Sequence, residues 1–179
     1  VIPIIARVAE TNPRIRISLT ICNSEIALQA LMDFWADVTM LASAQADPRL
    51  HYVNFGSRPL VLYVRKGHAL SNRRAVRLKE LQGQKMITRE AGSQTRLLFE
   101  QACAKANITP DQKLEINNRD AFCEAVAHGL GIGIIGDRGL VSDDRLQRIN
   151  ISGVKIRMDR QLACLKERKN ARLIKTFLA

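Results

Sequence analysis

The amino-acid sequence predicts an α/β protein with largely parallel sheets. Segments whose apolar residues recur at helical spacing alternate with short extended segments, an order that packs helices against a parallel sheet. Pairs such as Asn12-Pro13 and Gly92-Ser93 mark the changes of pattern. With 179 residues, 46% of them hydrophobic, the chain can form one good core or two small lobes.

The first third of the chain contains two predicted helices and two predicted strands. Helical spacing of apolar residues predicts a helix over residues 2–9, which Asn12-Pro13 ends. Strict alternation of apolar and polar residues predicts a strand over residues 14–21. Asn23-Ser24 can cap a second helix, and residues 36–42 form the next predicted strand.

The remaining elements continue the alternation. Gly92-Ser93 precedes a helix that Asn107 can end in the left-handed conformation, and Asn118 can cap another helix. A helical turn is expected near residues 76–81, and the last helix near residues 173–177. The extended patterns predict strands at residues 50–55, 59–65, 85–89, 114–117 and 161–165.

The stretch HGLGIGIIGD, residues 128–137, contains Gly131, Gly133 and Gly136 in the G-x-G-x-x-G order of dinucleotide-binding folds. That fingerprint must follow a strand and open a helix. Here a helix precedes the glycines, Gly129 fits the helix end where φ is positive, and a strand follows. The sequence therefore favours structural glycines over a nicotinamide site, and no cofactor is expected.

The chain is strongly basic, with a net charge of +11 and an estimated pI of 10.1. This excess suits an anionic ligand, nucleic acid or an acidic partner, and a solvated basic surface explains it equally well. Aromatic residues make up 4% of the chain and are not interleaved with arginines, which disfavours a platform for stacked bases. The apolar runs are of strand length, so no contact with a membrane is expected.

Cysteine and histidine spacings suggest no metal centre. The four cysteines form no C-x-x-C pair, and the three histidines lie in unrelated segments. Buried free thiols are the expected state, which favours a reducing compartment. The cysteines are Cys22, Cys103, Cys123 and Cys164.

Several phrases, in one order, resemble the effector-binding domain of LysR-type transcriptional regulators. They are IPIIARVAETNPRIRISL, LMDFWADVTM, LVLYVRKGHAL, VRLKELQGQKMITREAGSQTR and AVAHGLGIGII. A finer resemblance, to regulators associated with aminoethylphosphonate catabolism, rests on REAGSQTR, NNRDAFCEAVAHGLGIGII and CLKERKNARLIKTFL. The sequence departs from the family at three places: the family's first strand does not precede Val1, Phe34 replaces a frequent glycine, and Gly136 replaces a frequent proline.

The resemblance implies the type 2 periplasmic-binding-protein-like fold, in which two α/β lobes are joined by two crossover segments with a ligand cleft between them. Residues 1–57 plus 153–179 would form lobe I, and residues 58–152 would form lobe II. The family's N-terminal winged helix-turn-helix is not part of the sequence, so DNA would be bound only through that domain. A cytoplasmic regulator that forms a homodimer through its effector domain is implied.

The segment from Arg89 to Arg96 is the strongest candidate for an effector site, and its only acid, Glu90, is expected to form a salt bridge with a nearby arginine. If Ser93 is the N-cap, the next amides are unpaired donors at the positive end of the helix dipole. Gly92 allows a ligand to approach the backbone closely, and the side chains of Ser93, Gln94 and Thr95 can donate hydrogen bonds to it. Arg96 can add a guanidinium that donates two parallel hydrogen bonds, if it turns toward the cleft. The ligand would be a small anion such as a carboxylate or phosphonate.

Each of these positions has a plainer interpretation. Ser93 can be an ordinary N-cap on a surface helix, and the resemblance to the family is what favours a binding role. Asn23 and Ser24 form the matching helix start in the first lobe and carry the same alternative. Arg119, beside the Asn118 cap, can point into the cleft or into solvent.

Two other functions compete with a regulatory one. A solute receptor of the same fold would serve a transporter in an oxidising space, which the unpaired cysteines disfavour. An enzyme is disfavoured because the sequence offers no nucleophile–base pair, metal spacing or phosphate loop.

Overall fold

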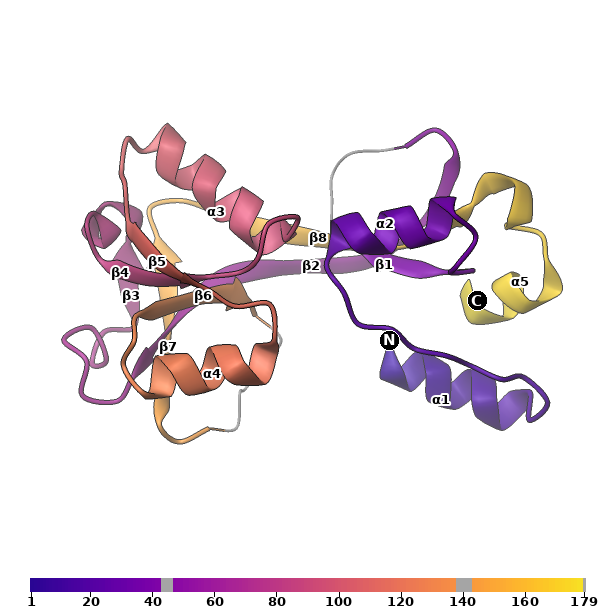
Figure 1. Cartoon of the computed structure of the whole chain (residues 1–179), viewed down its shortest axis with the longest axis horizontal. Coiled ribbons are helices and arrows are strands. Elements are labelled where there is room, and N and C mark those ends of the chain that lie inside the picture. The colour runs from indigo at the N-terminus through magenta and orange to yellow at the C-terminus, as the bar shows by residue number, and fades with distance from the viewer. Residues whose placement is uncertain (43–46, 138–142, 179) are drawn as a thin grey trace. The chain divides into compact units, whose positions relative to one another are not determined.

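The computed structural model describes residues 1–42, 47–137 and 143–178 (Figure 1). The chain forms two compact units: unit 1 contains Val1–Gly56 and Arg160–Ala179, and unit 2 contains Ser57–Asp159. The chain passes from one unit to the other within strands β2 (Leu50–Arg65) and β8 (Arg157–Leu165). The lobe limits expected from the family resemblance stay a prediction.

Unit 1 holds α1 (Ile2–Thr11), α2 (Ser24–Met32), β1 (Thr39–Leu41), the 3-10 turn η2 (Lys166–Arg168) and α5 (Arg172–Leu178). Strand β1 pairs with β8 antiparallel, in a register that sets Thr39 opposite Ala163. Helix α2 buries Ala27 and Leu31 against this pair, together with Leu41. The predicted cap is confirmed, because Asn23 Oδ1 accepts a hydrogen bond from the amide of Ile26 at 3.0 Å.

The strand predicted over residues 14–21 is wrong. Between the turn at Pro13-Arg14 and the start of α2, the backbone forms neither a helix nor a strand, and it pairs with none of the described strands. Ile17, Leu19 and Ile21 are 37%, 49% and 89% exposed. Alternation of side chains identifies a chain suited to a half-buried sheet, but it supplies no partner strand.

Unit 2 is a mixed sheet with helices on both faces. Its strands lie in the order β3-β7-β2-β6-β4-β5. Pairs β4·β5, β4·β6 and β3·β7 are parallel, whereas β2 is antiparallel to both β6 and β7, so the expectation of a largely parallel sheet is wrong. The elements are β3 (Ala75–Arg77), η1 (Leu78–Leu81), β4 (Lys85–Thr88), α3 (Gln94–Lys105), β5 (Asp111–Glu115), α4 (Arg119–Ala127), β6 (Ile132–Gly136) and β7 (Leu146–Ser152).

The two helices of unit 2 cover opposite faces of its sheet (Figure 1). Side chains alternate along β2, so Leu62 packs with Phe99 of α3 and Tyr63 packs with Phe122 of α4. Both faces of the central strands are therefore buried. This explains the continuous apolar run of β2 and β6 in the sequence.

The glycine-rich phrase belongs to the packing of α4 on β6. Gly129 has φ +74 directly after the helix, as predicted. A Cβ on Gly133 would stand 2.6 Å from Phe122 Cζ, and a Cβ on Gly136 would stand 2.6 Å from Met158 Cε. The predicted order of helix, turn and strand is confirmed, and it is the reverse of the order that a dinucleotide fingerprint needs.

Candidate functional site

The candidate site lies at the carboxyl edge of β4 and β5 in unit 2. These parallel strands are in register up to Thr88 and Glu115, and the amide of Ile116 donates to the carbonyl of Thr88 at 3.0 Å. The chain leaves β4 into α3 on one face and leaves β5 into α4 on the other face. Adjacent parallel strands whose connections depart to opposite faces open a crevice at their carboxyl ends, where α/β proteins bind ligands.

Helix α3 starts at this edge with its first amides uncapped by a side chain. Gly92 has φ +79, a conformation that an L-residue rarely adopts. Ser93 is the N-cap, as predicted, but its hydroxyl makes no hydrogen bond to the first turn. Ser93 is 8% exposed. The first amides of α3 have no partner within the helix, so they can donate to an acceptor placed there.

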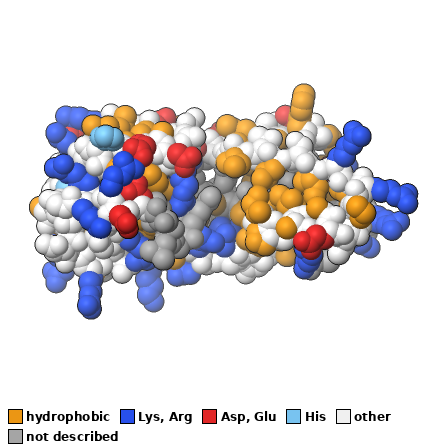
Figure 2. Space-filling model, turned by 90° about the horizontal axis from the view of Figure 1, so that it is seen from below, with side chains coloured by type: hydrophobic (Ala, Val, Ile, Leu, Met, Phe, Trp, Pro, Cys, Tyr) orange, Lys and Arg blue, Asp and Glu red, His pale blue; other side chains and the backbone are white. Residues whose placement is uncertain are grey.

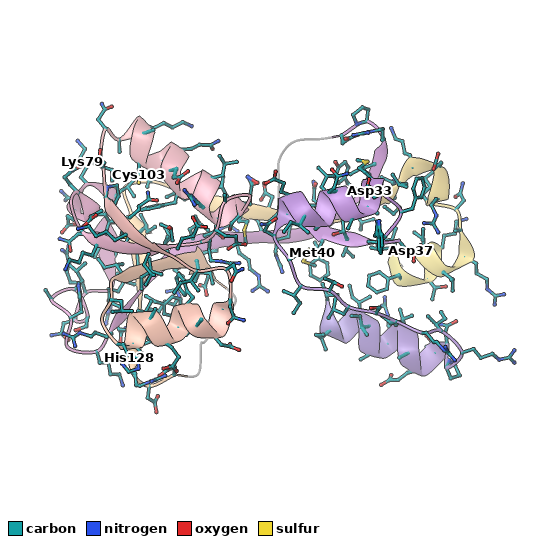
Figure 3. All side chains as sticks on the ribbon, viewed as in Figure 1. Asp33, Asp37, Met40, Lys79, Cys103 and His128 are labelled. Atoms are coloured by element: carbon teal, nitrogen blue, oxygen red, sulfur yellow. The ribbon has the colours of Figure 1, made fainter. Side chains whose placement is uncertain are left out.

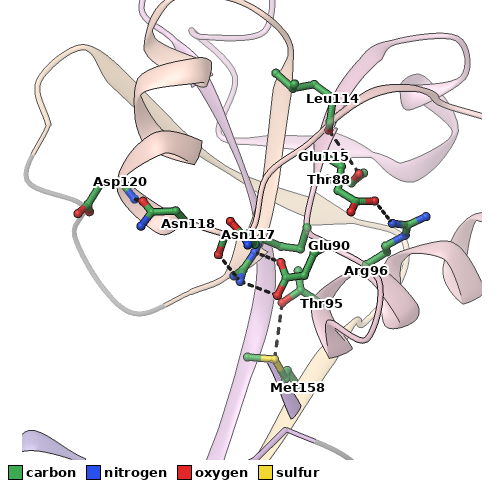
Figure 4. A network of polar contacts seen from close by, with 11 residues as sticks. Thr88, Glu90, Thr95, Arg96, Leu114, Glu115, Asn117, Asn118, Asp120 and Met158 are labelled. Atoms are coloured by element: carbon green, nitrogen blue, oxygen red, sulfur yellow. Dashed lines mark hydrogen bonds and ion pairs between the residues drawn. The ribbon is translucent and has the colours of Figure 1, made fainter. Parts of the chain in front are cut away.

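Thr95 places a second hydroxyl on the same turn. Its side chain is 5% exposed in surroundings that offer a weak acceptor, since Oγ1 donates to Met158 Sδ at 3.8 Å (Figure 4). A thioether sulfur is a poor acceptor compared with an oxygen. Gln94 is half-buried between Ser93 and Thr95.

Arg89 links the two helix starts. Its Nε donates to Glu90 Oε2 at 2.9 Å, and its Nη2 donates to the carbonyl of Asn117 at 2.9 Å (Figure 4). The ion pair is mostly buried, with the side chains of Arg89 and Glu90 19% and 16% exposed. This confirms the expectation that Glu90 pairs with a nearby arginine, and it holds the segment before α3 beside the segment before α4.

Arg96 is engaged by carboxylates. Its Nε donates to Glu100 Oε1 at 2.8 Å and its Nη1 to Glu115 Oε2 at 2.5 Å. The bond to Glu100 is the larger cause of the raised pKa of Arg96. The guanidinium is thus held between α3 and β5. Fewer of its N–H groups can donate to an incoming anion than in an unpaired arginine.

Arg119 differs from Arg96 because part of its guanidinium has no partner. It is the first residue of α4, after Asn118, whose Oδ1 accepts from the amides of Asp120 and Ala121 at 2.9 and 3.0 Å. The side chain is half-buried, and its Nη1 is buried without a hydrogen bond to any described residue. A buried donor of this kind is costly unless an acceptor reaches it.

The surroundings of Arg119 are polar on the α4 face. Burial and the charge of Asp137 raise the pKa of Tyr63, while Arg148 and Arg119 act in the opposite direction. Asp137 itself pairs with Arg148, whose Nη2 donates at 2.6 Å. The cation of Arg119 therefore lies near the neutral phenol of Tyr63 and near the Asp137–Arg148 ion pair, whose charges balance.

The first-lobe candidates make hydrogen bonds inside unit 1. Asn23 caps α2, and Ser24 Oγ accepts from the amide of Ala42 at 3.1 Å. The structure thus assembles Gly92, Ser93, Gln94 and Thr95 on one turn, with Arg119 at the neighbouring helix start. Their binding role stays a prediction, as does that of Asn23 and Ser24.

Two contributors were absent from the sequence prediction. Tyr63 and Met158 reach the site from strands β2 and β8. Arg89 belongs to the predicted segment, although no separate role is predicted for it from the sequence. No local pattern in the sequence indicates that Met158 contacts Thr95, which lies 63 residues earlier in the chain.

Residues 1–42, 47–137 and 143–178 contain no cluster of three or more His, Cys, Asp or Glu side chains that could hold a metal ion. No helix among them is both long and apolar enough to cross a membrane.

Comparison with protein families identifies the class of this domain. Residues 1–179 match the family described as the LysR substrate binding domain, and the chain belongs to that family. The regulatory domain of CcmR from Synechocystis PCC6803, solved in complex with 2-PG, superposes with a TM-score of 0.89 at 25% identity, covering 99% of this chain and 87% of that one. The effector-binding domain of QuiR, solved with shikimate, gives a TM-score of 0.87 at 18% identity, covering 98% and 85%. The type 2 periplasmic-binding-protein-like fold is thereby confirmed.

Named relatives are transcription regulators. The HTH-type transcriptional activator CmpR of Synechocystis is 30% identical over 123 residues, 69% of this chain and 40% of that protein. The HTH-type regulator YybE of Bacillus subtilis is 26% identical over 165 residues, 92% of this chain and 56% of that protein. The chain thus spans about half the length of these relatives, which are regulators rather than enzymes or transporter receptors.

Proposed function

We propose that this chain is the effector-sensing domain of a cytoplasmic LysR-type transcription regulator, and that it binds a small carboxylate or phosphonate anion at the start of α3. Binding would control how the full-length regulator engages DNA through a further N-terminal domain. The observation that carries the proposal is the pair of buried residues Ser93 and Thr95 on the first turn of α3: no side chain caps this turn, and the Thr95 hydroxyl donates to a sulfur. The buried Nη1 of Arg119, which has no hydrogen-bond partner among the described residues, supports it independently.

An anion suits this place for electrostatic reasons. The start of a helix stabilises negative charge by about 0.3–1 kcal/mol when exposed and by up to about 2 kcal/mol when partly buried. Hydrogen bonds to a charged group contribute about 1.5–3 kcal/mol each. Two or three of them, less the cost of desolvation and ordering, are compatible with micromolar affinity, about −8 kcal/mol.

The solved relatives supply reasonable first probes. CcmR was solved with 2-PG and QuiR with shikimate, and aminoethylphosphonate follows from the finer resemblance. We therefore propose a thermal-shift screen of these compounds, inorganic phosphate and a broad set of metabolite carboxylates, followed by calorimetry of each compound that raises the melting temperature. A neutral analogue of each hit should have no effect.

Matched variants locate the binding site. Replacing Ser93 by Ala together with Thr95 by Val should weaken binding at least tenfold, whereas Ser71→Ala with Thr109→Ala removes two loop hydroxyls and should leave the affinity unchanged. If the first pair of changes leaves wild-type affinity for a confirmed anion, the anion does not bind at the start of α3.

The arginines provide a second comparison. Arg119→Gln should weaken binding, and Arg96→Gln, which releases two carboxylates from an ion pair, should have the smaller effect. A Ser24→Ala variant tests the contribution expected from the first lobe. Equal losses for Arg96 and Arg119 would indicate a general charge effect instead of a contact.

We also propose that the domain forms a homodimer, as the family resemblance implies. Unit 1 carries most of the large exposed apolar side chains, and Figure 2 shows hydrophobic side chains gathered on the face of this unit that it views. Exposed apolar patches of this kind favour association. Light scattering on the full-length regulator measures the oligomeric state directly.

A further inference from the structure

Two segments of the chain carry most of its excess basic charge: residues 65–85, and residues 145–175 with ten Lys or Arg and two carboxylates. Residues 65–85 carry seven Lys or Arg side chains and one carboxylate, so that they hold +6 of the net +11 of the chain. The seven basic residues are Arg65, Lys66, Arg73, Arg74, Arg77, Lys79 and Lys85. A block of like charge of this kind often binds a partner of opposite charge.

The fold presents these side chains on one margin of unit 2. The segment runs from the end of β2 through a turn to β3, which forms the edge of the sheet beside β7, and then through η1. All seven basic residues are exposed, and Figure 3 labels Lys79 on η1 at this margin. We call the surface formed by residues 65–85 the basic edge.

Carboxylates neutralise little of the basic edge. Arg73 pairs with Glu80, and among the described residues none of the other six forms an ion pair. Neighbouring acids are already held: Asp111, the β5 partner of Lys85, pairs with Lys113. Glu124 and Asp143 both pair with Arg145, whose carbonyl accepts from the amide of Lys66 at 2.7 Å. Six cations thus remain free to meet an external polyanion.

We propose that the basic edge binds the phosphate backbone of duplex DNA. Contact with another protein usually depends on aromatic or apolar anchors at the centre of the interface. Residues 65–85 contain no Phe, Tyr or Trp, and Val76, Leu78 and Leu81 are buried in the core. A surface of exposed Arg and Lys without apolar anchors suits phosphates, whose contacts carry no sequence information.

This contact would be independent of the effector site. It gives the sensing domain its own weak, sequence-independent hold on DNA, beyond the domain that reads an operator. Non-specific contacts of this type have Kd values of about 10⁻⁴–10⁻⁶ M at physiological salt, and their logarithm varies linearly with the logarithm of the salt concentration. The slope counts the phosphates, at about 0.9 for each one contacted.

The test is fluorescence anisotropy of two short duplexes of unrelated sequence, titrated with the 179-residue chain at several salt concentrations. We expect equal affinity for both duplexes and a steep salt dependence. The variant Lys66→Gln, Arg74→Gln, Arg77→Gln, Lys79→Gln should bind at least tenfold more weakly at low salt. Its salt slope should be shallower by about 3, since up to four phosphate contacts are lost.

The control changes the same net charge elsewhere. Arg14→Gln, Lys105→Gln, Arg172→Gln, Lys175→Gln alters four exposed cations outside the basic edge. This variant should keep the affinity and slope of the wild type, and melting curves verify that both variants fold. Equal losses in both variants, or equally tight binding of a polyglutamate peptide of matched charge, would overturn the proposal in favour of general polyanion attraction. Absence of DNA binding by the wild type at low salt would overturn it outright.

Discussion

Thr95 Oγ1 donates a hydrogen bond to Met158 Sδ across 3.8 Å, and this weak bond engages a hydroxyl that is only 5% exposed. Thr95 stands on the first turn of α3, and Met158 stands on the part of β8 that belongs to the same unit. Folding has therefore buried a donor against a soft sulfur when an oxygen acceptor would satisfy it better. The anion proposed above would supply such an oxygen acceptor.

The first prediction concerns stability without ligand. Thr95→Val should change the free energy of unfolding by less than about 1 kcal/mol, because a weakly bonded hydroxyl is replaced by a methyl of similar volume. Urea unfolding measures this change, and calorimetry with a confirmed anion measures affinity in the same variant. A loss of several kcal/mol in stability would mean that the hydroxyl serves the fold instead of a ligand.

The second prediction concerns Arg119. Arg119→Met should raise the free energy of unfolding by about 0.5–1 kcal/mol, since it removes a cation from the positive end of α4 and a buried donor without a partner. Chemical denaturation in the absence of anions tests this sign. A marked destabilisation would show that the guanidinium already has an acceptor in the folded protein.

The ends of the helices were the most predictable part of the fold. Asn23, Ser93 and Asn118 all stand at the N-caps that the sequence indicates, and Asn107 has φ 52 after α3. These features depend on neighbours within a few residues, so local patterns are sufficient to reveal them.

Errors arose where distant pairing decides the structure. The two strands expected at residues 50–55 and 59–65 are one strand, because Gly56 with φ +88 bends the strand without ending it. Strand β7 was missed, since its buried Leu146 and Ile149 are three residues apart and show no alternation. The sequence likewise places Arg96 beside the predicted cleft but cannot show that Glu115, 19 residues away, holds it.

The third prediction tests the packing role of the glycines. Gly133→Ala should destabilise the domain by about 1–3 kcal/mol, because its Cβ would overlap Phe122 Cζ and Val126 Cγ2. In a Phe122→Leu background the same change should cost less, by at least about 0.5 kcal/mol, as contacting residues are coupled. Identical costs in the two backgrounds would show that Phe122 does not explain the glycine.

The fourth prediction concerns thiol reactivity. Cys22 is exposed, contrary to the expectation of buried thiols, whereas Cys103, a residue of α3, is buried (Figure 3). Burial raises the pKa of Cys103 to about 11 and also raises the pKa of Cys164. At pH 8 the Cys103 thiol is therefore almost entirely protonated, and thiolate is the reactive form. Iodoacetamide followed by mass spectrometry should label Cys22 first, with Cys103 and Cys164 labelled only after unfolding. Early labelling of Cys103 would contradict the packing of α3.

The fifth prediction concerns the homodimer and the exposed segment before α2. Ile17 and Ile21 are 37% and 89% exposed on a backbone that pairs with no described strand, so both apolar and main-chain groups are available to a second copy. Ile17→Lys with Ile21→Lys should weaken self-association at least tenfold, because each charge would have to be desolvated in the interface. The matched control, Leu97→Lys with Leu130→Lys, adds the same charge to exposed positions of unit 2 and should leave the association constant unchanged. Sedimentation velocity over a range of concentrations of the full-length regulator measures both. Equal weakening by the two pairs would assign the effect to net charge, and an unchanged dimer in the first variant would place the interface elsewhere.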